Sequence, residues 1–149
     1  MKYVTGIFAL NLPCSLDTCG DWHSCSINWD NVDIRESNNS ILKDYGIETN
    51  QSVKFLNSSK KYNVANHIRA LLDMLIIGNY GYAQGMKEDY ICNDKYTKEI
   101  FNQVLKLKTL DNWTGINKFM THEYKMKWLN YTKWYKYNLG DPPIYRVVK

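Results

Sequence analysis

The spacing of apolar residues changes near residue 63, and this change limits the chain to a fold with strands first and helices second. Before it, short apolar runs are separated by turn residues, which is typical of strands. After it, apolar residues recur about every 3.6 positions, and in the first such segment they are Val64, Ile68, Leu71, Leu72 and Leu75. The sequence therefore predicts an α+β fold, in which a small, mainly antiparallel N-terminal sheet is covered by a C-terminal group of about three helices.

The first sixty residues are predicted to hold the strands. The segments with strand-like composition are residues 3–10, 24–29, 32–34 and 52–56. The segment 3–10 is apolar almost throughout, which is typical of a strand buried on both faces. Pro13 and Gly20 mark a loop between the first two segments.

Three helices are predicted after residue 63. Asn63 is the expected N-cap of the first, and Gly78 suits the left-handed conformation that follows a helix end. The second and third helices run from about residue 94 to 108 and from about 112 to 137, and their expected caps are Asn93 or Asp94, and Asp111.

The length of 149 residues is typical of one domain. We expect a single α+β domain with a strand-rich part (1–60), a helical part (63–137) and a C-terminal tail or edge strand (138–149). Pro142 and Pro143 end the last helix, and residues 144–148 are a candidate final strand. No apolar run approaches the roughly 18 residues of a membrane span, so no membrane contact is predicted. The start of the chain has no small-residue cleavage site, which favours a cytoplasmic protein.

The formal net charge of +4 conceals a gradient along the chain. Residues 1–50 carry 3 basic and 7 acidic side chains, residues 51–100 carry 7 and 5, and residues 101–149 carry 9 and 3. The acidic side chains of the first part suit a basic, nucleic-acid-binding partner, and they include Asp17, Asp21, Asp30, Asp33 and Glu36.

Several catalytic and cofactor motifs are absent. The glycine-rich segment 78–85 matches neither a dinucleotide-binding turn nor a phosphate-binding loop, and no G-x-S-x-G sequence occurs. His122 and Glu123 begin like a zinc-protease helix, but Met126 occupies the position of the second histidine. No cofactor is therefore predicted.

Cys14, Cys19, His23 and Cys25 form the densest group of reactive side chains. Their types suit zinc, although the spacing C-x4-C-x3-H-x-C differs from the usual zinc knuckle. We therefore predict no bound metal and a set of reduced thiols, some of which fill small apolar spaces, with zinc as an alternative. A third interpretation is a small enzyme in which one of these cysteines acts as nucleophile with His23 as base.

Asp21, Trp22 and His23 lie in a loop that Gly20 opens. Side chains of these types can form a recognition surface. The competing interpretation is that Trp22 anchors the loop in the core while His23 hydrogen-bonds to the backbone. The sequence leaves the choice open.

The stretch after residue 123 interleaves aromatic residues with lysines. Lysines that meet phosphates and rings that stack on bases would bind nucleic acid. The same pattern is produced by an amphipathic helix with its aromatic side in the core, and by a protein interface, including one between two copies of the chain. These alternatives remain open, and the residues concerned are Tyr124, Lys125, Lys127, Trp128, Tyr131, Lys133 and Trp134.

Seven segments together resemble an uncharacterised family of small proteins from low-GC bacteria and their mobile elements. They read TGIFALNLPC, GDWH, DYGIE, YNVANHIRALLDML, AQGM, DYICNDKYTKEIF and EYKMKWLN. The resemblance covers nearly the whole chain up to Asn130. It implies gene neighbourhoods of toxin–antitoxin, phage-defence and counter-defence systems, and it transfers no activity and no catalytic residue.

We therefore expect a non-enzymatic protein that neutralises or regulates a larger protein partner (a nuclease, a toxin or a defence effector) by steric occlusion, as antitoxins and anti-CRISPR proteins do. Nucleic-acid binding through the basic, aromatic C-terminal helix and a Cys/His enzyme are the alternatives. The residues expected to contact a partner are Asp21, Trp22, His23, Tyr124, Lys125, Lys127, Trp128, Tyr131, Lys133 and Trp134.

Overall fold

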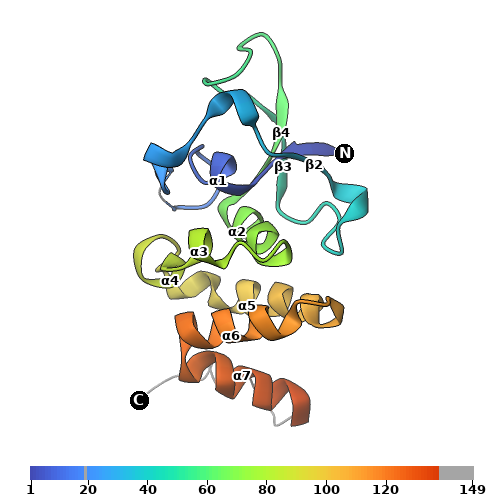
Figure 1. Ribbon diagram of the computed structural model, residues 1–149, viewed down its shortest axis with the longest axis vertical. Helices are drawn as coiled ribbons and strands as arrows, with labels where there is room; N and C mark the ends of the chain where they lie inside the picture. The colour runs from blue at the N-terminus through green and yellow to red at the C-terminus, as the bar shows by residue number, and fades with distance from the viewer. Residues whose placement is uncertain (19, 138–149) are drawn as a thin grey trace. The chain divides into compact units, whose positions relative to one another are not determined.

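The computed structural model describes residues 1–18 and 20–137, and the chain divides into two compact units (Figure 1). The first unit, Met1–Ala83, contains the sheet, and the second, Gln84–Lys149, is helical as far as it is described. The predicted α+β class is therefore confirmed: a four-stranded sheet comes first, and about six helices follow it.

The sheet is mixed rather than mainly antiparallel. Its strands are β1 (Lys2–Val4), β2 (Ile34–Glu36), β3 (Ile47–Gln51) and β4 (Tyr62–Ala65), in the order β2-β1-β4-β3. The pairs β1–β2 and β3–β4 are antiparallel, whereas the central pair β1–β4 is parallel, with Val4 opposite Val64. Parallel neighbours need a long connection, and here that connection contains both outer strands.

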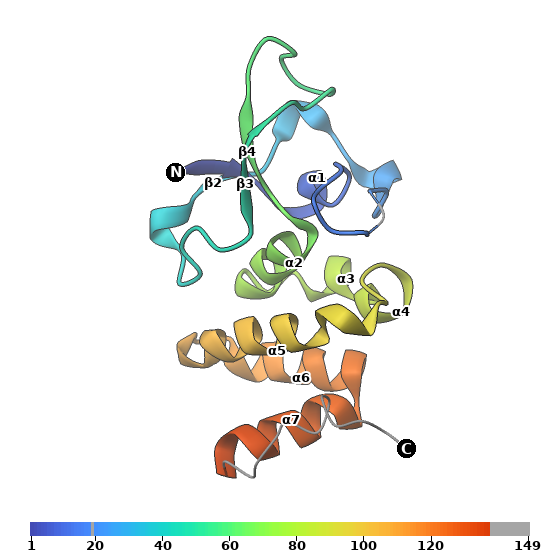
Figure 2. The same cartoon turned by 180° about the vertical axis from the view of Figure 1, so that it is seen from behind.

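The helices of the first unit are short except for α2. They are α1 (Gly6–Ala9), α2 (His67–Ile76), α3 (Tyr80–Ala83) and the 3-10 turns η1 (Ser24–Ser26), η2 (Trp29–Asn31) and η3 (Ser37–Asn39). Helices α1 and α2 lie side by side, and the connection between β3 and β4 projects beyond these strands in both views (Figures 1 and 2).

The second unit is built from helices. They are α4 (Met86–Asp89), α5 (Thr97–Leu105), α6 (Trp113–Tyr124), α7 (Met126–Tyr137) and the 3-10 turns η4 (Asp94–Tyr96) and η5 (Lys106–Thr109). In the part of the chain that the structure describes, no helix combines the length and the apolar character that crossing a membrane requires.

The predicted strands match the structure only in part. The strand expected at 3–10 ends at Val4, because Gly6 adopts a φ of 65° and the chain then turns into α1. The segment 24–29 is wrong as a strand and forms parts of two 3-10 turns, while 52–56 follows β3 rather than forming it. The strand expected at 144–148 lies outside the described residues.

The predicted helices are found with different boundaries. Residues 62–65 form β4, so the cap of α2 is Asn66, whose side chain accepts from the backbone N–H of Arg69 at 2.9 Å, and not Asn63. Gly78 has a φ of 78° after α2, as predicted. The prediction of one continuous third helix is wrong, because Lys125 adopts a φ of 54° and separates α6 from α7.

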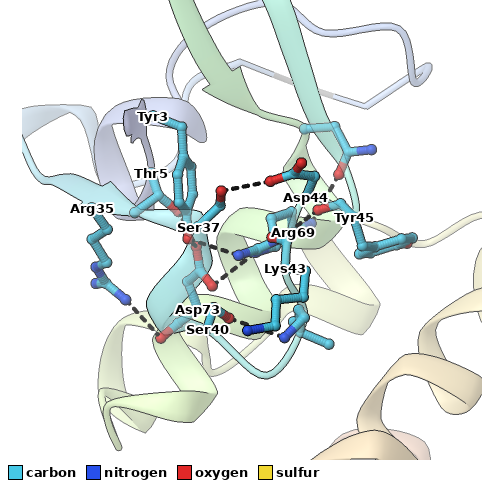
Figure 3. Close-up of polar contacts among 12 residues, drawn as sticks. Tyr3, Thr5, Arg35, Ser37, Ser40, Lys43, Asp44, Tyr45, Arg69 and Asp73 are labelled. Atoms are coloured by element: carbon cyan, nitrogen blue, oxygen red, sulfur yellow. Dashed lines mark hydrogen bonds and ion pairs between the residues drawn. The ribbon is translucent and has the colours of Figure 1, made fainter. Parts of the chain in front are cut away.

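A buried polar network centred on Arg69 and Asp73 joins α2 to the sheet (Figure 3). The Arg69 Nε donates to Asp73 Oδ1 at 3.0 Å, and neither side chain is more than 2% exposed. The other carboxylate oxygen accepts from the hydroxyls of Tyr3 at 2.7 Å and Thr5 at 2.6 Å. The other two guanidinium nitrogens of Arg69 also donate: Nη2 to Tyr3 Oη, and Nη1 to the carbonyls of Lys43 and Tyr45. Both buried charges are thus compensated, as a stable core requires.

The network also dictates a glycine at position 46. A Cβ at Gly46, which has a φ of 72°, would lie 2.8 Å from the Cβ of Arg69 and 3.0 Å from Asn66 Oδ1. The Gly46 carbonyl meanwhile accepts from Asn66 N–H at 2.7 Å. The backbone before β3 therefore approaches α2 too closely for any side chain at this position.

Removing one member of the ion pair should lower the free energy of unfolding far more than replacing both members together. We predict that Arg69→Met lowers the free energy of unfolding by about 3–5 kcal/mol, because it leaves the Asp73 carboxylate buried and unpaired. Arg69→Met/Asp73→Leu should recover part of that loss. Urea unfolding measures both. Glu36→Gln, at an exposed ion pair with the N-terminus, is the control and should change little.

Candidate functional site

The loop between α1 and β2 has little regular structure, yet side-chain bonds fix it to the rest of the first unit. Asn11 Nδ2 donates to the carbonyl of Trp22 at 2.5 Å, and the Trp22 indole N–H donates to the carbonyl of Tyr82 at 2.6 Å. Near its start, the backbone N–H and hydroxyl of Ser15 donate to Glu48 Oε2 at 3.0 and 2.5 Å. The loop is therefore held in place as binding loops on rigid scaffolds are.

His67, the first residue of α2, fixes the first part of the same loop. Its Nε2 lies 2.6 Å from the carbonyl oxygen of Leu12, and its Nδ1 is hydrogen-bonded to the hydroxyl of Thr18. A carbonyl only accepts, so Nε2 carries the proton and Nδ1 accepts from Thr18. Burial lowers the pKa of His67, although the bond to Leu12 and the charge of Glu48 oppose this effect. The ring therefore acts as a neutral, two-sided connector.

Two groups of aromatic rings lie on this loop and its neighbours. In the first, the His23 ring contacts Trp22 and Tyr82 edge-on, with centroids 4.9 and 5.3 Å apart. In the second, Trp29 contacts Phe8 edge-on at 5.3 Å and stacks on Phe55 at 4.6 Å. The Trp22 indole thus anchors the loop, as one interpretation of the sequence expected, and it also belongs to an accessible cluster, as the other did.

A pocket of about 270 Å³ lies between the two aromatic groups, since Phe8 of one and Tyr82 of the other both line it. Its polar wall contains an ion pair in which Arg35 donates from Nε to Asp33 Oδ1 at 3.0 Å and from Nη2 to Oδ2 at 2.7 Å. The full lining is Gly6, Ile7, Phe8, Asn28, Asn31, Asp33, Arg35, Met74, Ile77, Asn79 and Tyr82.

The surface around the pocket is acidic. Residues 3–34 contain four aspartates and no lysine or arginine. Of these, Asp21 and Asp30 are exposed; in the chain Asp21 directly precedes Trp22 and Asp30 directly follows Trp29. In the aromatic groups of these two tryptophans, Tyr82 and Phe55 are 39% and 46% exposed. The Lys54 Nζ, 4.8 Å from the Phe55 ring centroid, is the cation that contacts this aromatic group among the described residues. We call residues 13–18 and 20–33, together with Phe55 and Tyr82, the loop surface.

The cysteines of the predicted zinc set are only partly described, because Cys19 lies outside the described residues. Cys14 is half-buried, with Sγ 4.0 Å from the Thr18 hydroxyl, and Cys25 is exposed. Among the side chains that the structure describes, no three histidine, cysteine or acidic residues gather closely enough to hold a metal ion. The prediction of reduced thiols without a metal, and the alternatives of zinc binding by Cys14, Cys19, His23 and Cys25 or catalysis by a cysteine, are therefore untested.

Three aromatic residues of the C-terminal pattern fill the core of the second unit instead of lying on its surface. Tyr124, Trp128 and Tyr131 are 4%, 0% and 3% exposed. Their rings surround Phe101, with centroids 4.8, 5.0 and 5.2 Å away. The choice between core and interface, which the sequence left open, is thus decided for these three: in this structure they are not available to a partner.

The lysines of the same pattern do face solvent. Lys125, Lys127 and Lys133 are exposed, and Trp134 is half-buried. One carboxylate already neutralises part of this charge: Asp94 Oδ1 lies 3.3 Å from Nζ of both Lys87 and Lys127. Burial works against the charged form of Asp94, but these two lysines outweigh it and lower its pKa.

Sequence reasoning named Asp21, Trp22 and His23 but missed the residues that complete the loop surface. Phe55 and Tyr82 come from distant segments, so no local pattern joins them to the loop. One sequence signal pointed to this surface: residues 3–34 contain no lysine or arginine. The packing of a core does not require such a run.

Comparison with protein-family models, with curated protein sequences and with solved structures finds no match to this chain. The family resemblance noted from the sequence therefore stays a prediction, and the candidate site rests on geometry and charge alone.

The His67 connector should make the first unit acid-sensitive. The folded state lowers the pKa of His67, so the unfolded state binds a proton first as the pH falls below about 6.5. We predict that the free energy of unfolding is fully retained above about pH 7 and falls as the pH drops below about 6.5, until the lowered pKa of the folded state is reached.

Urea unfolding at several pH values tests this prediction. In His67→Gln the slope between pH 7 and 5 should largely disappear, although the variant is less stable at pH 7. In His23→Gln, which alters an exposed ring, the slope should persist. An unchanged slope in His67→Gln would assign the acid sensitivity to another group.

Proposed function

We propose that this chain is a non-enzymatic binding protein whose loop surface occludes a basic site on a larger protein partner. In this proposal the partner is a nuclease, a toxin or a defence effector, and both act in the cytoplasm. The observation that carries the proposal is the juxtaposition of exposed aspartates with accessible aromatic rings on a loop that the core holds rigidly.

Rigidity and ring type support a recognition role for the loop surface. Tyrosine, tryptophan and phenylalanine are enriched at protein interfaces and supply much of their binding energy. A loop already held in its bound shape loses little conformational entropy on association. The bonds of Asn11, Trp22 and His67 to this loop therefore favour binding over flexible display.

Charge supports a basic partner. Asp21 and Asp30 are exposed, and no cation occurs within residues 3–34. Nucleases and other nucleic-acid-binding effectors carry positive surfaces for phosphates. An acidic, aromatic surface attracts such a site and competes with its nucleic acid, which is the physical basis of steric neutralisation.

Charge reversal on the loop surface should abolish this interaction. We predict that Asp21→Lys/Asp30→Lys weakens binding at least tenfold, because both changes place cations against a basic partner. The partner is first captured from host cells on tagged protein and identified. Binding and inhibition are then measured with the two purified proteins at several salt concentrations.

Glu88→Lys/Asp89→Lys is the matched control, since it makes the same change of charge at exposed residues of the second unit. It should leave binding intact. If both variants bind equally well, or if the captured partner is acidic and salt-insensitive, the loop surface is not the interface.

One observation favours a second candidate, nucleic-acid binding by the second unit. Its residues 84–149 carry 12 basic and 7 acidic side chains. Lys108 Nζ lies 5.3 Å from the ring centroid of Tyr135, which is 51% exposed. A ring next to a cation suits a base and its phosphate, although the burial of Tyr124, Trp128 and Tyr131 removes most of the rings expected to stack.

This second candidate predicts salt-dependent binding of single strands. Lys106→Ala/Lys108→Ala should weaken the binding of a labelled oligothymidylate several-fold in fluorescence anisotropy. The slope of log affinity against log salt should fall by roughly 0.7 for each phosphate that the variant no longer neutralises. Lys60→Ala/Lys61→Ala, at exposed lysines of the first unit, is the matched control. No measurable binding at low salt would contradict this candidate.

A further inference from the structure

The pocket on the loop surface is small for a cofactor but large enough for one long side chain. Its volume is about 270 Å³, whereas drug-sized ligands and cofactors occupy roughly 300–1,000 Å³. It opens between the two aromatic groups of the loop surface, with Phe8 on one side and Tyr82 on the other. Anchor pockets for a single partner residue have this central position in protein interfaces.

Polar groups of the pocket retain unused hydrogen-bonding capacity. The side-chain amides of Asn31 and Asn79 have no hydrogen bond within the part of the chain that the structure describes. Asp33 accepts one bond on each carboxylate oxygen, both from Arg35, and each oxygen has a further lone pair. The wall of the pocket can therefore accept several additional donors.

The charge of Arg35 is already compensated within the pocket. Burial opposes the charged form, but the hydrogen bonds and charge of Asp33 outweigh it and raise the pKa of Arg35. Its Nη1 also donates to the carbonyl of Asp73 at 3.3 Å, which ties it to the central network (Figure 3). Arg35 is neutralised by Asp33, and the exposed Asp30 and Asp21 directly precede Asn31, which lines the pocket, and Trp22, whose indole bonds to the carbonyl of the lining residue Tyr82. The charges next to these pocket segments in the chain are therefore negative.

We propose that this pocket receives an arginine side chain of the partner. The proposal rests on the proposed function, a basic partner bound at the loop surface. The guanidinium supplies planar donors for the oxygens of Asn31, Asn79 and Asp33, and its flat face suits the rings of Phe8 and Tyr82. The apolar stem packs on the aliphatic wall, which consists of Ile7, Met74 and Ile77. A lysine ammonium would satisfy fewer of these acceptors.

The test uses the full chain and a defined probe, the N-acetyl, N-methylamide derivative of arginine. Titration followed by NMR should shift the side-chain amide signals of Asn31 and Asn79 and the ring signals of Tyr82. The citrulline derivative, which is neutral and similar in shape, should bind about tenfold more weakly, as expected for the loss of a charge-assisted hydrogen bond. The lysine derivative should also be weaker than arginine.

A pair of matched variants places the binding in the pocket. Ile77→Lys puts a cation at the pocket from a residue that is 58% exposed, so folding should tolerate it, and it should weaken arginine binding at least tenfold. Ile34→Lys makes the same change at a 51% exposed residue. Ile34 is the first residue of β2 and is flanked in the chain by the pocket residues Asp33 and Arg35. Because successive side chains of a strand point to opposite faces, arginine binding should persist in Ile34→Lys.

Each contrary result overturns the proposal. Equal binding of citrulline or lysine shows that the guanidinium is not recognised. Equal loss in Ile77→Lys and Ile34→Lys shows an effect of net charge only, and no shift at high probe concentration shows that no arginine site exists. The two proposals fail separately: loss of partner binding in Asp21→Lys/Asp30→Lys with no effect of Ile77→Lys leaves the loop surface as the interface and removes the pocket from it.

Discussion

The pairing of Arg69 with Asp73 inside the first unit is the interaction on which the arrangement of the sheet and the loop surface depends. A buried ion pair is tolerated only where every remaining donor and acceptor finds a partner. Here those partners come from two separate segments: the hydroxyls of Tyr3 and Thr5 on and after β1, and the carbonyls before β3. Arg35 on β2 adds a bond to the backbone carbonyl of Asp73. The pair thus fixes the register of the surrounding strands against α2.

The loop surface is positioned from the same helix. At the start of α2, two residues before Arg69, His67 binds Leu12 and Thr18 and so fixes the start of the loop. Beyond the end of α2, the carbonyl of Tyr82 accepts a hydrogen bond from the Trp22 indole. Met74 within α2 and Ile77 at its end form part of the pocket wall. Core and candidate site therefore share one scaffold, and a change in α2 reaches both.

The sequence predicted the class of fold because periodicity reports which face of an element is buried. It predicted the order of strands and helices and the glycine after α2. Of the two candidate caps Asn93 and Asp94, Asn93 caps the 3-10 turn η4 that precedes α5, where its side chain accepts from Lys95 N–H. It failed where tertiary contacts override local preference. Residues 62–65 read as the start of a helix, but pairing with β1 and β3 makes them a strand. Likewise, no local signal marks Lys125 as a helix break.

The candidate site was less accessible to sequence reasoning, and the reason is physical. Aromatic residues interleaved with lysines look the same whether the rings face the core or a partner, and the structure buries Tyr124, Trp128 and Tyr131. Besides Tyr135 of the second unit, the exposed aromatic side chains Phe55 and Tyr82 lie in the first unit, on segments far apart in the chain. Burying a ring in the core is favourable because it removes the ring from water, whereas an aspartate without a partner must stay hydrated. Exposed rings on the same surface as such aspartates are therefore not explained by core packing. That combination is the basis of the proposal that the loop surface contacts a partner.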